Sequence, residues 1–360
     1  MLLDALLVIA GLVILILGGE ALVRGASTLA TKVGLSPLVI GLVVVSAATS
    51  APEMAVTVGA VLGGEPGLAV GNVIGSNTAN ILLILGLSAL LSPLLIKRQI
   101  VRFDIPVMLG LSVLMLLFSL DGEITFLEGA LLFGGLVVHA IMSITISKRS
   151  EGADQEPEEL PLNARPVRLW LALLLLAVGV AALAAGAQLL VTGAVSIATS
   201  LGVSSLVVGL TVVAIGTSLP ELATSIIALR RGERNMAVGN IVGSNIFNIG
   251  LVLGLPAMLF GEGIPVPVAA IAVDIPLMLA AAVALLPIAF TGFAIKRWEG
   301  ALFLGLYVAY LTHLVLDSTG HDAAAGFTNL MLAFVLPLLA GTLIAVTAYE
   351  VGLIRGRSKK

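Results

Sequence analysis

The sequence predicts an all-α membrane protein built from two inverted five-helix repeats and one extra C-terminal transmembrane helix. Three observations support this fold class. Hydrophobic residues make up 59% of the 360 positions and charged residues only 11%, whereas soluble chains carry about 25% charged residues. The apolar residues gather in runs long enough to cross a bilayer, and the second half of the chain repeats the first. A soluble enzyme, a disordered chain and a collagen-like fibre are therefore excluded.

The individual spans follow from the length of each apolar run. A transmembrane helix needs about 20 mostly apolar residues. Eleven segments meet this requirement, namely 2–22, 34–63, 68–92, 104–120, 125–146, 169–190, 203–229, 236–260, 264–291, 298–316 and 326–349.

The basic residues predict the orientation of these spans. If the N-terminus lies outside, all 18 Lys and Arg residues fall in inner loops or in the C-terminal tail, and the outer loops hold acids and one His. This is the distribution expected for a cell membrane protein with its C-terminus inside, in an inner or plasma membrane. We expect a first repeat over 1–146, an acidic cytoplasmic linker over 147–168, a second repeat over 169–316, and the extra helix with its basic tail over 317–360.

The internal repeat is strong. Residues 34–86 align with 202–254 at an offset of 168, with 28 identities and no gap, and Asp104-Ile105-Pro106 matches Asp274-Ile275-Pro276. Each unit spans five helices, and because five is odd the second copy enters the membrane upside down. Inverted repeats of this kind are typical of secondary transporters, with the substrate site near the midplane.

Two acidic residues lie inside the apolar runs at matching positions of the repeat. Glu53 ends the block Thr49-Ser50-Ala51-Pro52-Glu53, and Glu221 ends Thr217-Ser218-Leu219-Pro220-Glu221. A carboxylate at membrane depth is costly and is by default a functional residue. The proline in each block loosens the helix and frees carbonyl oxygens, which are tolerated there only beside protein or an aqueous cavity.

The following span of each repeat adds neutral oxygen ligands. Ser76 and Asn80 are four residues apart, as are Ser244 and Asn248, so each pair lies on one helix face. Ca²⁺ prefers 6–8 oxygen ligands that include carboxylates, and two ionised glutamates neutralise one Ca²⁺. The chain has no Cys and only three His, which disfavours thiolate and His-rich metal sites. We therefore expect a site for hard cations.

At these residues the sequence resembles the sodium/calcium exchanger family, over both repeats. The resemblance implies Na⁺ and Ca²⁺ as transported substrates, no cofactor, two long tilted helices that slide, and no enzymatic activity. It also implies side-chain ligands at Thr49, Ser50, Glu53, Ser76, Asn80, Thr217, Ser218, Glu221, Ser244 and Asn248, with backbone carbonyls at Ser46 and Ala214. Because some relatives, notably potassium-dependent ones, carry Asp where this chain has Asn248, we expect potassium-independent exchange. We also expect electrogenic exchange with more than two Na⁺ per Ca²⁺, because the oxygen ligands of the two repeats are numerous enough to hold more than two small cations.

Three other functions were weighed against Na⁺/Ca²⁺ exchange. A Ca²⁺/H⁺ exchanger of the same superfamily is the nearest, although that branch usually has an acid where this chain has Gly75 and Gly243. A channel fits inverted repeats less well, and a membrane enzyme lacks a nucleophile or phosphate loop beside the paired glutamates. The net charge of −3 gives no nucleic-acid-binding signal. The partners expected are the two ions and the lipid bilayer, and the sequence carries no signal for the oligomeric state.

Overall fold

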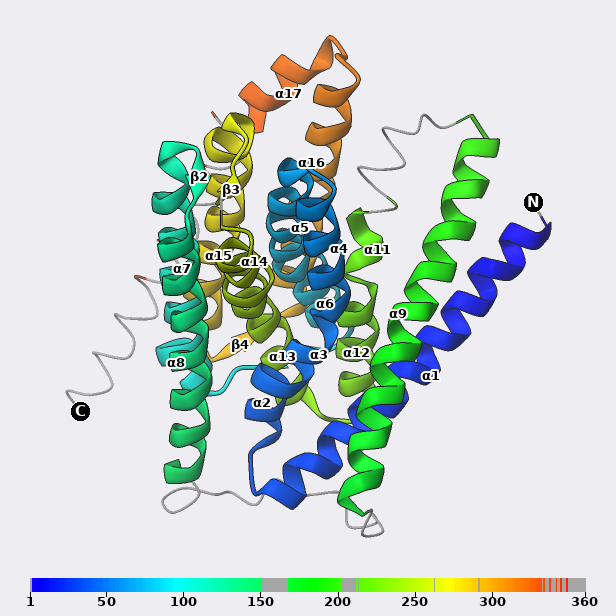
Figure 1. Cartoon of the computed structure of the whole chain (residues 1–360), viewed down its shortest axis with the longest axis vertical. Coiled ribbons are helices and arrows are strands. Elements are labelled where there is room, and N and C mark those ends of the chain that lie inside the picture. Colours follow the sequence, from blue (N-terminus) through cyan, green and yellow to red (C-terminus); the bar gives the residue numbers. More distant parts are fainter. Residues whose placement is uncertain are drawn as a thin grey trace.

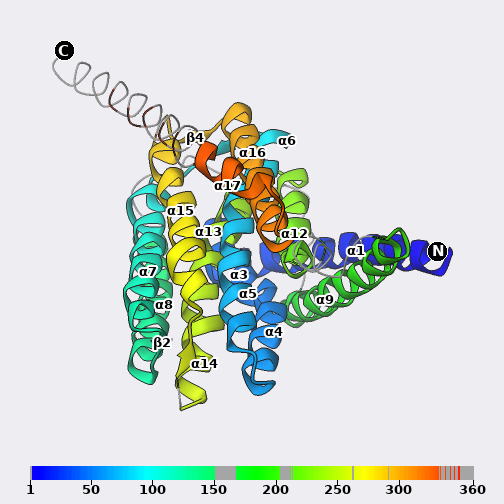
Figure 2. The ribbon, with the colours of Figure 1, turned by 90° about the horizontal axis from the view of Figure 1, so that it is seen from above.

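A bundle of helices with two long helices on one side makes up the part of the chain that the structure describes (Figure 1). The structure is a computed structural model. It describes residues 2–150, 168–202, 214–261, 263–290 and 292–331, together with the isolated positions 212, 333, 337, 341, 344 and 348. The two long helices are α1 (Leu2–Val33) and α9 (Leu169–Ser200), which lie beside the bundle when it is seen from above (Figure 2).

Helices α1 and α9 cross as an antiparallel pair through matching glycines. A methyl group at Gly18 would lie 2.8 Å from the backbone nitrogen of Leu183, and one at Gly186 would lie 2.8 Å from that of Leu15. Gly11 meets Gly186 in the same way, and Gly25 meets the carbonyl of Ala172. The glycines recur every seven residues, so they stay on one face and let the two backbones touch.

The span that carries Glu53 is broken in the middle. It consists of α2 (Pro37–Val39), the π-helical segment η1 (Ile40–Val45), α3 (Ser46–Thr49) and α4 (Ala51–Leu62), with a bend of 40° between α3 and α4. Pro52, at the start of α4, has no N–H to donate back to the preceding turn, which explains the break. The corresponding helices of the second half are α11 (Ala214–Thr217) and α12 (Leu219–Arg230), interrupted at Ser218 before Pro220.

The next span of each half lies at the centre of the molecule. The first comprises α5 (Pro66–Ala79), the π-helical segment η2 (Asn80–Leu85) and α6 (Gly86–Leu91). The second comprises α13 (Arg234–Phe247), η6 (Asn248–Leu253) and α14 (Gly254–Leu259). These spans are 78% and 83% buried, against 22–39% for the other unbroken spans among the described residues.

The remaining elements surround this centre. In chain order they are β1 (Leu94–Leu95), the π-helical segment η3 (Ile100–Asp104), α7 (Ile105–Phe118), the 3₁₀ turn η4 (Ser119–Asp121), β2 (Glu123–Ile124), α8 (Phe126–Ser150), β3 (Ile264–Pro265), η7 (Ala270–Asp274), α15 (Ile275–Phe290), β4 (Ala294–Ile295), α16 (Arg297–Ser318) and α17 (Ala323–Leu330). The short strands form two antiparallel pairs, with Leu94 opposite Ile295 in β1–β4 and Ile124 opposite Ile264 in β2–β3.

Two matching glutamates start the outer helices α8 and α16. Glu128 accepts hydrogen bonds from the amide and hydroxyl of Thr125, both at 2.8 Å, and Glu299 accepts one from the amide of Lys296 at 2.7 Å. Such bonds satisfy amides that lack a partner in the first turn of a helix. The glutamate that opens the repeated Glu-Gly-Ala-Leu stretch therefore has the same role in both halves.

The structure supports most of the predicted spans and corrects some of their boundaries. Among the described residues, eight helices are long and apolar enough to cross a membrane, or nine if the bent pair is one span. Each coincides with a predicted segment, whereas 203–229 and 326–349 extend into residues outside the described part, as do most of the predicted linker 147–168 and the basic tail. The first span was predicted to end at residue 22 and the sixth at residue 190, but α1 runs to Val33 and α9 to Ser200. Arg24 and Lys32, predicted in a loop, therefore lie on α1.

Candidate ion-binding site

The two intramembrane glutamates lie at the helix breaks, and both are buried. Glu53 is in the first turn of α4 and Glu221 in the first turn of α12, and each is 1% exposed. Within the described part of the chain, neither carboxylate has a hydrogen-bond partner. A buried carboxylate without a partner is strongly unfavourable unless a cation or proton compensates it.

Hydroxyl groups gather around these breaks. Thr49 and Ser50 of the first break and Ser218 of the second are almost completely buried, and the last two hydroxyl oxygens have no hydrogen-bond partner among the described residues. Thr49 joins the two halves, because its Oγ1 lies 3.3 Å from Oδ1 of Asn240 and 3.5 Å from Oγ of Ser244. Thr217, the last residue of α11, is half-buried.

The backbone at the two breaks differs. The amide of Ser50 donates to the carbonyl of Ser46, four residues earlier, at 3.0 Å. The amide of Ser218 instead donates to the carbonyl of Ile215, three residues earlier, at 3.1 Å. It therefore does not donate to the carbonyl of Ala214, four residues earlier. The hydroxyl of Ser46 holds the two halves together, because it donates toward the carbonyls of Gly41 and Asn240 at 2.8 and 2.9 Å.

The central helices supply further oxygen atoms. Ser76 and Asn80 of the first half and Ser244 and Asn248 of the second are at most 2% exposed. Within the described residues, Oγ of Ser76, both amide atoms of Asn80 and Oδ1 of Asn248 lack hydrogen-bond partners. Such buried polar atoms are rare in folded proteins. Their concentration beside two carboxylates fits a site whose oxygen atoms bind a cation.

Two asparagines that sequence reasoning did not assign hold the broken helices in place. Asn72 donates to the carbonyl of Glu53 at 3.1 Å and to the hydroxyl of Thr57 at 3.0 Å. Asn240, its counterpart in the repeat, donates to Ser225 at 3.3 Å and accepts from Thr49. The available signal was the repeated Gly-Asn dipeptide that opens each block, although its spacing alone does not show which atoms it contacts.

The donor set suits a hard cation. No group of three or more His, Cys, Asp or Glu side chains comes together among the described residues. Two carboxylates are therefore the anionic part of this site, and hydroxyl, amide and carbonyl oxygens make up the rest. Oxygen-only ligation with two negative charges matches Ca²⁺ and also the similarly sized, singly charged Na⁺.

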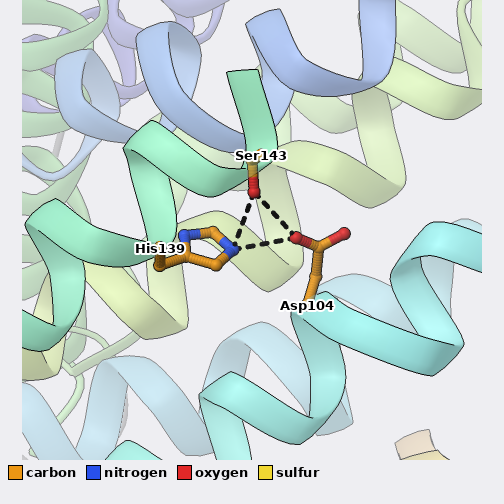
Figure 3. Close-up of polar contacts among 3 residues, drawn as sticks. All are labelled: Asp104, His139 and Ser143. Atoms are coloured by element: carbon orange, nitrogen blue, oxygen red, sulfur yellow. Dashed lines mark hydrogen bonds and ion pairs between the residues drawn. The ribbon is translucent and has the colours of Figure 1, made fainter. Parts of the chain in front are cut away.

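A second buried polar cluster was not predicted from the sequence (Figure 3). Nε2 of His139 on α8 lies 2.8 Å from Oδ1 of Asp104, and Oγ of Ser143 donates to the same oxygen at 3.1 Å. The Asp104 and His139 side chains are fully buried, and Phe103 stacks on the imidazole at a ring distance of 5.6 Å. This cluster joins α8 to the start of α7. The sequence marked Asp104 only as part of the repeat.

Comparison with known proteins shows the family of this chain. The family model described as "Sodium/calcium exchanger protein" matches residues 3–145 and 171–316. The chain belongs to this family, whose members are antiporters in membranes and not enzymes.

Individual relatives match along most of their length. The putative antiporter CaxA of Alkalimonas amylolytica is 40% identical over 317 residues, which cover 86% of this chain and 98% of the relative. The sodium/calcium exchanger MaX1 of Methanosarcina acetivorans is 33% identical over 345 residues, covering 86% and 97%. A solved structure of the sodium-calcium exchanger NCX_Mj, soaked with 10 mM Na⁺ and zero Ca²⁺, superimposes with a TM-score of 0.73 at 31% identity, covering 86% of this chain and 98% of that one.

Proposed function

We propose that this protein exchanges Na⁺ for Ca²⁺ across the membrane by alternating access at the Glu53–Glu221 site. The observation that carries the proposal is the pair of buried carboxylates at the two helix breaks that lack hydrogen-bond partners among the described residues, together with buried hydroxyl and amide oxygens on the same and the neighbouring helices that also lack partners. One Ca²⁺ neutralises both glutamates. The Na⁺ ions that replace it satisfy the same charges, so an empty site is disfavoured during the transition.

The ligands proposed are the twelve residues that the resemblance implies. Ten of them are at most 2% exposed, namely Ser46, Thr49, Ser50, Glu53, Ser76, Asn80, Ser218, Glu221, Ser244 and Asn248. Thr217 and Ala214 lie on α11 beside the second break. Ser46 and Ala214 contribute backbone carbonyls in this proposal, since the Ser46 hydroxyl is engaged in binding Gly41 and Asn240.

Many transporters achieve alternating access with two halves that are related by inversion, and several contacts support this relation here. Gly11 contacts Gly186, and Gly18 contacts Gly179. Replacing each glycine by its counterpart 168 residues away in the other half turns the first contact into the second. In the same way, replacing each strand by its counterpart in the other half turns the pair β1–β4 into the pair β2–β3. In the proposed transition, α1 and α9 slide along the bundle together, and their glycine interface keeps them in contact.

The packing around Gly243 favours sodium over protons as the counter-ion. A methyl group at this position would lie 2.3 Å from Oγ of Ser46 and 2.4 Å from the carbonyl of Leu42. The acid that calcium/proton exchangers usually carry has no space at Gly243 in this arrangement, whereas a methyl group at Gly75, the matching position of the first half, would meet no described atom within 4 Å. The Ca²⁺/H⁺ alternative then has to rely on the two site glutamates alone as proton carriers.

The proposed setting is an inner or plasma membrane with the N-terminus outside and the C-terminus inside. One relative, 37% identical over 267 residues, is the inner membrane protein YrbG of Escherichia coli. The orientation rests on the distribution of Lys and Arg. A tag at residue 360 that reacts with an impermeant label on intact cells would contradict it.

The counter-ion is tested with purified protein in liposomes. Vesicles loaded with Na⁺ or with choline are diluted into radiolabelled Ca²⁺, and a proton gradient is imposed separately without Na⁺. We expect uptake only from Na⁺-loaded vesicles, and loss of uptake when monensin collapses the Na⁺ gradient. Uptake driven by the proton gradient in the absence of Na⁺ would support Ca²⁺/H⁺ exchange instead.

A further inference from the structure

Two carboxamides from opposite halves of the chain meet beside the ion-binding site. Asn77 lies near the end of α5, and Asn248 is the first residue of η6. Nδ2 of Asn248 donates to Oδ1 of Asn77 at 3.5 Å, and the two residues are 0% and 2% exposed. The contact directs the amide nitrogen of Asn248 toward Asn77. Its oxygen is left without a partner among the described residues.

An asparagine ligand has an orientation problem that an aspartate does not have. A carboxylate presents an oxygen whichever way it turns, whereas a carboxamide presents either an oxygen or an NH₂ group. An NH₂ group directed at a cation is repulsive, and a buried NH₂ without an acceptor is unfavourable. A neighbouring acceptor for the nitrogen therefore fixes the oxygen toward the ion.

The other half of the protein lacks this contact. Asn80 corresponds to Asn248, and neither of its amide atoms has a partner among the described residues. Asn245 corresponds to Asn77, and its Nδ2 donates to the carbonyl of Ile241 on its own helix at 2.8 Å. One of the two asparagine ligands is thus oriented by the opposite half, and the other is not.

We propose that Asn77 is a positioning residue that orients the amide of Asn248 and thereby sets the affinity for Ca²⁺. This inference rests on the proposed function. It assigns Asn77 no contact with the ion, because its oxygen accepts from Asn248 and its other amide atom, Nδ2, which has no partner among the described residues, cannot bind a cation. It also predicts that Asn77 becomes unnecessary when residue 248 is a carboxylate.

The test compares Asn77→Leu in the wild-type protein and in the Asn248→Asp variant. Leucine has about the size of asparagine but accepts no hydrogen bond. In the wild-type background we expect the KM for Ca²⁺ to rise about tenfold with little change in maximal rate, which corresponds to about 1.4 kcal/mol. In the Asn248→Asp background the same substitution changes KM by less than about twofold. Asn245→Leu is the matched control and also changes KM by less than about twofold.

Several results would overturn the inference. They are an unchanged KM in Asn77→Leu, an equal change in both backgrounds, or an equal effect of Asn245→Leu. If Asn77→Leu does not fold, Asn77→Ala takes its place. If Asn248→Asp does not transport, the same comparison is read from the rise in melting temperature on adding Ca²⁺. Wild-type protein without Na⁺-driven Ca²⁺ uptake would refute the proposed function, whereas normal wild-type transport with an unaffected Asn77→Leu refutes only this inference.

Discussion

Replacing His139 with Leu tests whether the cluster of Asp104, His139 and Ser143 holds α8 against α7. The substitution removes the imidazole that lies 2.8 Å from Asp104 and leaves a fully buried carboxylate with Ser143 as its remaining partner in the cluster. Removing one member of a buried pair costs about 3–5 kcal/mol. Because about 1.4 kcal/mol changes an equilibrium constant tenfold, the ratio of folded to unfolded protein falls by a factor of roughly 100–4,000.

The double variant Asp104→Leu/His139→Leu distinguishes the effect of leaving one polar partner unpaired from the effect of changing the size of the side chains. Replacing both members by apolar residues is often neutral or stabilising, so we expect the double variant to be more stable than His139→Leu. Stability is followed by heating the detergent-solubilised protein and recording the fluorescence of its two tryptophans. His313→Leu serves as a control, because His313 is only partly buried and contacts Thr328 at 3.2 Å.

Two outcomes would refute this reasoning. One is a melting temperature for His139→Leu equal to that of the wild type. The other is a double variant whose loss of stability equals the sum of the losses measured for His139→Leu and for Asp104→Leu alone, because the effects of groups that interact are not additive. The ion-binding site is untouched by these substitutions, so the variant protein that folds should still exchange ions.

Three further predictions follow from the site and the helix interface. Exchange should not require potassium, since both Asn80 and Asn248 are neutral; sodium-driven Ca²⁺ uptake with choline in place of potassium on both sides should be unchanged, and a strict requirement would contradict this. Exchange should be electrogenic, with more than two Na⁺ per Ca²⁺. A clamped membrane potential should then shift the end point of Ca²⁺ uptake, because moving each net charge across the membrane changes the free energy by about 2.3 kcal/mol per 100 mV. An end point that does not depend on the potential would mean neutral exchange. Gly186→Ala should slow exchange or destabilise the protein by about 1–3 kcal/mol, because its methyl group would lie 2.8 Å from the backbone nitrogen of Leu15. Gly110→Ala is the control, because its methyl group would meet no described atom within 4 Å. Equal behaviour of the two variants would argue against the close interface.

The sequence was informative wherever the membrane or the repeat constrained it. Apolar runs predicted most spans, because each backbone polar group in lipid must be satisfied within a helix. The burial of Glu53 and Glu221 followed from their positions inside such runs, and the structure places both at 1% exposure. Pro52 and Pro220 predicted the breaks next to them.

Features that depend on contacts between distant segments could not be predicted in the same way. The end of α1 was placed too early, because Arg24 and Lys32 were interpreted as loop residues, although long basic side chains can extend from a helix to the interface. The pairing of Asp104 with His139 joins helices 35 residues apart. Asn77 stands in the same repeated motif as Asn80, and only the crossing of α5 with η6 shows that it meets Asn248.

The most direct test of the central claim is Ca²⁺ uptake by Glu53→Gln and Glu221→Gln in Na⁺-loaded liposomes. Each substitution keeps the size of the side chain and removes one of the two negative charges, so a bound Ca²⁺ is left with an uncompensated charge in a site of low dielectric. We expect both variants to elute as folded, monodisperse protein in gel filtration and neither to take up Ca²⁺ above the level of protein-free vesicles. Near-normal uptake by either variant would contradict it.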